Sequence, residues 1–122
     1  MGLRPPATVE AIRAAEDALH VLLPEDYRAF FLVADGGEGP IGGESYLRLW
    51  PVRALPEEYI SYGFGEYAPQ FIPFGSNGGG TAYVFDARRA DLPVLQVEFV
   101  ALDYDLALPA ANTFTEFLLG LP

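Results

Sequence analysis

The chain has 122 residues, of which 17 are acidic and seven basic, so its net charge at neutral pH is −10. This length suits one domain, and half of the residues are hydrophobic, which supplies a core and argues against disorder. An acidic surface repels nucleic acids and anionic membranes and attracts basic partners. The alternative is that the acidic residues only keep the protein soluble, so charge by itself does not establish a partner.

Cysteine is absent, which excludes disulfides, thiolate nucleophiles and cysteine-ligated metals and favours the cytoplasm. Residues 1–6 lack the apolar region of a signal peptide. No apolar run reaches the ~18 residues that a membrane span needs. The sequence therefore predicts a cytoplasmic protein that does not cross a membrane.

Two helices are predicted near the N-terminus. Thr8 suits the N-cap of the first, over residues 9–21. Its apolar stripe consists of Ile12, Ala15, Leu19 and Leu22, and Glu16 falls largely outside it.

The second helix is predicted to start at Pro24, which suits a first helical position. Its buried face, at helical spacing, consists of Tyr27, Phe30, Phe31 and Ala34. Gly36 and Gly37 can adopt the left-handed conformation that ends a helix.

The middle of the chain alternates between loops and short elements. Residues 35–45 are rich in glycine and predict a loop, whereas residues 46–50 alternate as a strand that buries Leu47 and Leu49. Residues 52–55 could form a second short strand. Residues 56–60, a proline followed by two acids, predict a short helix.

The last part reads as strands followed by a helix. Residues 71–74 and 81–85 predict a hairpin around the turn Gly75–Gly80, with Pro73 at an edge or a bulge, and residues 93–99 predict a further strand. Thr113 and Glu116 form a capping box for a closing helix. Two helices, a mostly antiparallel sheet and a final helix make one α+β domain over residues 1–122.

Three segments resemble the SUKH superfamily, in particular its Smi/Knr-type domain. They are Leu23–Gly37, the strand–glycine loop–strand unit Phe71–Asp86, and the closing Thr113–Leu118. The chain departs at Asp35, where the family more often has asparagine, and Asp35 is expected to keep the turn by a local backbone hydrogen bond. The resemblance implies a curved sheet flanked by helices and a non-enzymatic role. Bacterial members are commonly immunity proteins that bind and neutralise a polymorphic toxin, often a nuclease, and fungal relatives regulate cell-wall synthesis.

No catalytic residue, cofactor or metal site is predicted. His20, the one histidine, suits a helix C-terminus. Asp103 and Asp105 could bind a cation, but two ligands are too few for a calcium site. The Gly75–Gly80 loop could cradle a phosphate, although the lysine and helix of a P-loop are missing.

Acidic and tyrosine side chains in loops are the candidates for partner binding, since tyrosine anchors contacts and carboxylates steer association. The equally open alternative is that these rings pack on the core and the acids are merely solvated. The candidates are Glu38, Glu44, Tyr46, Glu66, Tyr67, Asp103, Tyr104 and Asp105. Together with the resemblance, they predict an immunity protein that binds a basic toxin domain. A regulator or scaffold without a toxin, and a small-molecule or phosphate binder, are the alternatives.

Overall fold

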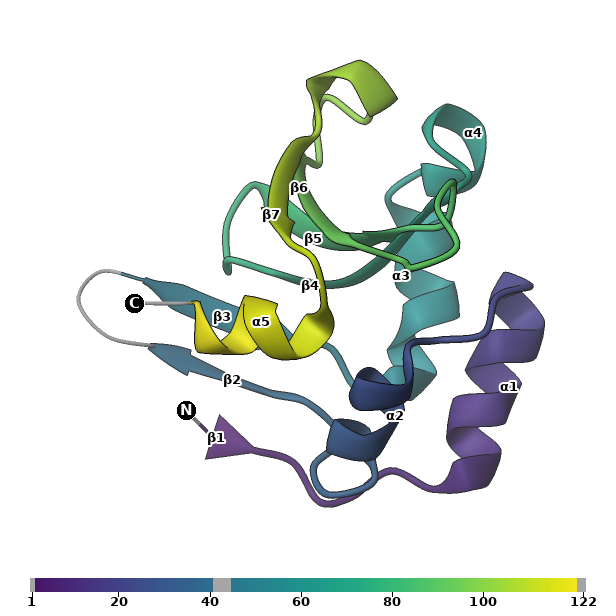
Figure 1. The fold of residues 1–122 in the computed structure, drawn as a ribbon, viewed down its shortest axis with the longest axis vertical. Helices are drawn as coiled ribbons and strands as arrows, with labels where there is room; N and C mark the ends of the chain where they lie inside the picture. The colour runs from purple at the N-terminus through teal and green to yellow at the C-terminus, as the bar shows by residue number, and fades with distance from the viewer. Residues whose placement is uncertain (1, 41–44, 121–122) are drawn as a thin grey trace.

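A computed structural model of the protein describes residues 2–40 and 45–120. Within them an antiparallel sheet of seven strands carries helices on both faces (Figure 1). The elements in chain order are β1 (Gly2–Leu3), α1 (Val9–Leu19), α2 (Glu25–Phe31), β2 (Gly37–Pro40), β3 (Tyr46–Leu49), the 3-10 helix η1 (Val52–Ala54), α3 (Leu55–Ser61), α4 (Phe64–Tyr67), β4 (Phe71–Ser76), β5 (Thr81–Asp86), β6 (Val94–Glu98), the 3-10 helix η2 (Tyr104–Leu106), β7 (Leu108–Ala111) and α5 (Phe114–Leu119). The α+β fold, with two helices near the N-terminus and one at the C-terminus, is confirmed.

The sheet follows the order of the chain from β1 to β7, and every neighbouring pair is antiparallel. Helices α1 and α2 are inserted between β1 and β2, and η1, α3 and α4 between β3 and β4. Because no strand crosses over another, β1 and β7 are the two edges of this sheet.

Helix α1 starts as predicted but ends earlier. The Thr8 hydroxyl caps it, and His20 leaves helical geometry with a φ of 55°. Leu22 therefore does not continue the apolar stripe and is 76% exposed. Glu16, expected outside the stripe, is instead buried. Its carboxylate accepts a 2.8 Å hydrogen bond from the amide of Leu23, which offsets the cost of burying it.

Helix α2 is shorter than predicted, and Pro24 is its cap rather than its first helical residue. The amide of Asp35, which would extend the helix by donating to Phe31, donates to the Pro5 carbonyl at 3.0 Å. The Phe31 carbonyl accepts instead from the amide of Ala7 at 2.9 Å. The N-terminal segment therefore ends this helix, and the two glycines do not.

The glycine-rich segment 35–45 is not only a loop, since its described part contains β2, which pairs with β3. Gly36 has a φ of +76°, and a Cβ there would lie 2.5 Å from the Leu49 carbonyl oxygen. The glycine pair thus allows close strand packing rather than a helix stop. Residues 41–44 are outside the described part of the chain.

Residues 52–55 turn into η1 and the start of α3 instead of forming a strand. The Val52 amide donates to a carboxylate oxygen of Asp35 at 2.8 Å, so Asp35 caps this turn from a distance rather than locally. Leu47 and Leu49 are buried on β3 as predicted, and α3 confirms the helix expected over residues 56–60.

Strands β4 and β5 form the predicted hairpin, with a shift of register between Pro73 and Gly75 that confirms a bulge. A Cβ on Gly75 would lie 2.6 Å from the Arg48 carbonyl oxygen, so this glycine lets β3 approach β4. The Thr113 hydroxyl caps α5 by accepting from the amide of Glu116 at 3.0 Å. β1, β2 and β7 were not predicted.

Each face of the sheet has its own core. The larger core packs α1, α2 and α5 against one face, and its largest aromatic members are Tyr27, Phe31, Phe74, Phe85 and Phe114. The smaller core joins α4 to the other face and consists of Phe64, Ala68, Phe71, Ala82, Val84 and Val97. The sheet is therefore covered on both faces, with α4 over the smaller core, whereas α3 contributes Leu55 to the larger core and packs beside α1 (Figure 1).

Candidate protein-binding surface

The predicted partner-binding residues separate into two groups. Glu38 and Tyr46 lie on β2 and β3, whereas five others lie on α4 and on η2 with its N-cap residue. Those others are Glu66, Tyr67, Asp103, Tyr104 and Asp105. The two groups are on different parts of the fold (Figure 1), because η2 joins β6 to β7, three strands and more away from β3. Glu44 lies outside the described residues.

The group on β2 and β3 is already occupied by contacts within the chain. A carboxylate oxygen of Glu38 lies 2.6 Å from Nε of Arg48, across the β2–β3 ladder. This hydrogen bond raises the pKa of Arg48. The Tyr46 ring lies against Gly78, so close that a Cβ there would contact it at 2.7 Å. Neither residue offers an unpaired charge or a free ring to a partner.

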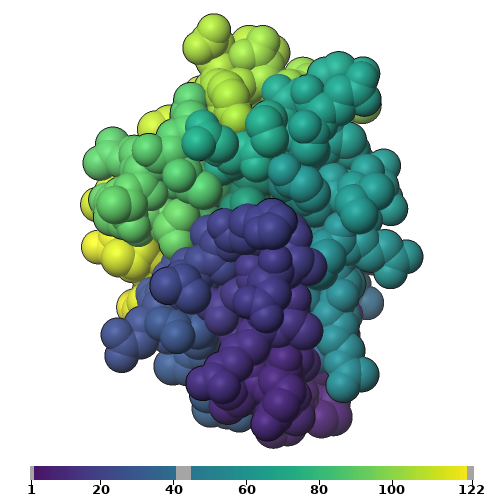
Figure 2. Space-filling model, turned by 90° about the vertical axis from the view of Figure 1, so that its right-hand side faces the viewer, coloured from purple at the N-terminus to yellow at the C-terminus, as the bar shows by residue number. Residues whose placement is uncertain are grey.

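The second group lies at one end of the molecule, where α4 and η2 lie side by side (Figure 2). We define the upper surface by seven exposed residues: Ile60, Tyr62, Glu66, Tyr67, Val100, Asp103 and Asp105. Ile60, Tyr67 and Val100 are 76%, 62% and 97% exposed. Within residues 2–40 and 45–120, ion pairs involve Glu38, Asp86 and Asp91 but none of the three upper-surface acids. This end is therefore acidic, aromatic and apolar at once.

Stacked aromatic rings link the upper surface to the interior of the domain. The rings of Tyr62 and Phe99 are stacked with centroids 4.0 Å apart. The Trp50 ring is stacked against both, with its centroid 6.1 Å from that of Tyr62 and 6.3 Å from that of Phe99. These rings come from the residues that follow α3, β6 and β3, so side chains distant in sequence form one stacked cluster. Such stacked pairs contribute about 0.5–1.5 kcal/mol beyond the area they bury.

Tyr104 is held in place rather than presented to solvent. Its hydroxyl accepts a 2.9 Å hydrogen bond from the amide of Gln70, and its ring meets that of Phe71 edge-on at 4.9 Å. The Asp103 carboxylate caps η2 by accepting from the amide of Asp105 at 2.8 Å. The role left to Tyr104 is to position η2 and its two acids.

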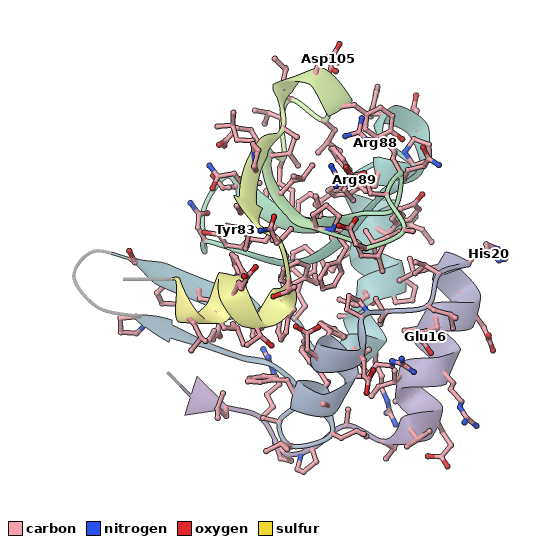
Figure 3. All side chains as sticks on the ribbon, viewed as in Figure 1. Glu16, His20, Tyr83, Arg88, Arg89 and Asp105 are labelled. Atoms are coloured by element: carbon pink, nitrogen blue, oxygen red, sulfur yellow. The ribbon has the colours of Figure 1, made fainter. Side chains whose placement is uncertain are left out.

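An arginine clamp, which sequence reasoning did not find, completes this attachment. Nε and Nη2 of Arg88 donate to the two carboxylate oxygens of Asp86 at 2.9 and 3.1 Å, and the Asp86 side chain is only 5% exposed. The guanidinium lies 4.4 Å from the centroid of the Tyr104 ring and 5.2 Å from that of Phe71. Figure 3 shows Arg88 between η2 and the sheet. Its only signal in the sequence was an aspartate two residues before an arginine.

The turn in the Gly75–Gly80 segment has its amides engaged within the chain. The amide of Gly78 donates to the Ser76 hydroxyl at 3.1 Å, and those of Gly79 and Thr81 donate to the Asn77 side chain at 2.9 and 3.2 Å. A phosphate cradle needs such amides free. A turn between the strands is confirmed over residues 77–80, whereas Gly75 and Ser76, predicted as part of the turn, belong to β4.

Other chemistry expected or considered has little support in the geometry. His20 is exposed and caps the C-terminal end of α1. Across the described ranges, no three His, Cys, Asp or Glu side chains converge as a metal site requires. None of the described helices combines the length and apolarity needed to cross a bilayer.

Fold, motifs and surface together define an α+β domain with an acidic and aromatic end. The SMI1/KNR4 family (SUKH-1) matches residues 6–120, and the chain belongs to this family. The resemblance drawn from the three sequence segments is thereby confirmed. No curated protein matches the chain. Members of this family bind other proteins in general.

Proposed function

We propose that this chain is a non-enzymatic immunity protein, which binds a toxin domain through the upper surface and covers the site at which the toxin acts. The observation that carries the proposal is the coincidence, at one end, of acids that form no ion pair within the described part of the chain with exposed aromatic and apolar side chains. Carboxylates accelerate encounter with a basic surface, while buried rings supply the energy of contact. Family membership supports a protein-binding role.

A nuclease toxin suits this surface best. A nuclease groove that binds phosphates is basic, and the upper surface carries Glu66, Asp103 and Asp105 outside the ion pairs of the described chain. The clamp of Arg88 on Tyr104 holds η2, so the acids need little ordering on binding. Pre-organisation of this kind lowers the entropic cost of association.

The proposal is tested by co-expression with the product of the neighbouring gene. If that product is toxic, this chain should restore growth and co-purify with it. A toxic product whose effect this chain does not relieve would refute the proposal, and a product without toxicity would favour a regulator or scaffold of the same fold.

The role of the upper surface is tested by neutralising two of its acids, Glu66→Gln with Asp105→Asn, which leaves the cap residue Asp103 intact. Association with the toxin domain should slow several-fold at low salt, and the difference should shrink as salt rises, because exposed charges are screened over about 10 Å at 0.1 M. The matched control is Glu10→Gln with Asp17→Asn on α1. Equal slowing in both double variants would show that net charge alone acts.

A further inference from the structure

The turn between β4 and β5 contains the dipeptide Asn77–Gly78, and both residues are exposed. An asparagine can react with its own chain, because the next backbone nitrogen can attack the carbonyl carbon of the side chain. Glycine in the second position leaves that nitrogen open to approach, since it has no side chain. Asn112, the other asparagine of the chain, is also exposed but precedes Thr113, whose β-branched side chain crowds the nitrogen.

The hydrogen bonds of this turn fold the Asn77 side chain over the peptide bond that joins it to Gly78. Oδ1 of Asn77 accepts from the amide of Gly79 at 2.9 Å and from that of Thr81 at 3.2 Å. The bond to Gly79, two residues on, forms an Asx-turn, which brings Cγ back towards the nitrogen of Gly78. That nitrogen is not part of the strand ladder, because β4 ends at Ser76 and the Gly78 N–H donates to the Ser76 hydroxyl at 3.1 Å.

The two amides that hold Oδ1 are also placed to accelerate the attack. Negative charge develops on Oδ1 as the nitrogen of Gly78 adds to Cγ. Backbone N–H groups about 2.7–3.1 Å from such an oxygen stabilise that charge, as in the oxyanion hole of an enzyme. We propose that this turn is a site of self-modification, at which the amides of Gly79 and Thr81 promote the deamidation of Asn77.

The reaction needs only water. The bond from the nitrogen of Gly78 to Cγ of Asn77 forms, and the bond from Cγ to Nδ2 breaks. Nδ2 leaves as ammonia with the proton that the Gly78 nitrogen gives up, and a succinimide ring remains. Water then opens the ring at one of its two carbonyl carbons, which yields aspartate or isoaspartate.

The two products differ in what they do to the turn. Each adds one negative charge to a chain of net charge −10. Aspartate keeps an oxygen that can accept from Gly79 and Thr81, whereas isoaspartate inserts a methylene group into the main chain. Isoaspartate should therefore break the 3.1 Å hydrogen bond from the amide of residue 77 to the Thr81 carbonyl, which closes the turn. This modification is independent of the proposed function.

The test incubates the whole protein at physiological temperature and mildly alkaline pH in ¹⁸O-labelled water, which marks every acid formed during the incubation. Trypsin, used afterwards in ordinary water, separates Asn77 on the peptide 54–88 from Asn112 on the peptide 90–122. Each donor at a developing oxyanion accelerates an enzyme reaction by about 10²–10³, and solvent weakens the effect on an exposed turn. Asn77 should therefore react about tenfold faster than Asn112 or more.

Mass spectrometry should find ¹⁸O and isoaspartate in the peptide 54–88, and Asn77→Gln should remove both. The absence of label from this peptide, its persistence in Asn77→Gln, or equal labelling of both peptides would overturn the inference.

Removing one donor tests the role of the turn itself. Thr81→Pro deletes the amide that donates to Oδ1, and proline is tolerated as the first residue of a strand. The matched control Thr81→Val keeps this amide and loses the 2.9 Å hydrogen bond from the hydroxyl to Glu98. Labelling of Asn77 should slow several-fold in Thr81→Pro and stay unchanged in Thr81→Val.

Equal rates in these two variants, or faster labelling in Thr81→Pro, would show that the turn does not promote the reaction and would overturn the inference. Circular dichroism checks that both variants fold. If Thr81→Pro does not fold, the comparison of Asn77 with Asn112 in the wild type decides the outcome.

Discussion

Replacing Arg88 with methionine should destabilise the fold by about 2–3 kcal/mol. The Asp86 carboxylate is only 5% exposed, and it accepts hydrogen bonds from Nε, Nη2 and the backbone amide of Arg88. Methionine keeps the backbone donor and much of the apolar stem but removes both guanidinium bonds. Asp86 is then left as a buried charge that keeps only the hydrogen bond from the backbone amide of residue 88.

The magnitude follows from how deeply the pair is buried. Breaking a fully buried ion pair costs about 3–5 kcal/mol. The Arg88 side chain is 36% exposed, so water can reach part of the space it leaves, and we take roughly half of that range. Loss of the contact with the Tyr104 ring adds about 0.5 kcal/mol.

Urea denaturation of the wild type and the variant measures the difference in the free energy of unfolding. The melting temperature should fall by roughly 8 °C. A double-mutant cycle of Arg88→Met with Tyr104→Leu should show a coupling of about 0.5 kcal/mol. Arg53→Met is the control, because Arg53 is exposed on η1. If both arginine variants lose the same stability, the clamp does not hold η2 and this reasoning is refuted.

Two further substitutions should stabilise the protein or leave it unchanged. The Tyr27 hydroxyl is buried and has no hydrogen-bond partner among residues 2–40 and 45–120, so Tyr27→Phe should leave the free energy of unfolding unchanged or raise it by up to about 1 kcal/mol. Burial also raises the pKa of Tyr27, so an ultraviolet titration of the folded wild type should show one tyrosine that resists ionisation and is missing from the variant. His20 has a φ of 55°, and glycine relieves a left-handed strain of about 1–2 kcal/mol at a cost in unfolded-state entropy of about 0.4–1 kcal/mol. His20→Gly should therefore stabilise by about 0.5 kcal/mol, and a lower midpoint in thermal melts would contradict this.

The predictions from sequence succeeded where the signal was local. Thr8 and Thr113 cap their helices as expected, and Leu47 and Leu49 are buried on one face of β3. Caps and alternation depend on residues within four positions of each other, so they can be read before the fold is known. The predictions failed where a hydrogen bond to a distant residue replaced a local one. The amide of Asp35 donates to the Pro5 carbonyl and not to Phe31, so α2 is shorter than predicted.

Strands β2 and β7 show the same division. Gly37–Pro40 and Leu108–Ala111 have none of the β-branched residues that indicate a strand, and they become strands only because β3 and β6 supply their hydrogen bonds. Strand formation depends on what lies across the ladder more than on intrinsic preference. The candidate surface was likewise predictable only in part. The sequence indicated which acids and tyrosines to consider, but it did not indicate that Glu38 pairs with Arg48 or that the Tyr104 ring faces Arg88.

Composition and short-range pattern thus establish an acidic α+β domain and its capped helices, because charge, periodicity and capping are properties of neighbouring residues. The family was indicated separately, by the resemblance of three sequence segments to the SUKH superfamily. The pairing of Glu38 with Arg48 across the ladder, the contact of Arg88 with the Tyr104 ring and the exposed edge at β7 arise only when residues far apart in sequence meet. Contacts of that kind are set by packing the sheet between its two layers of helices, and no single segment contains them.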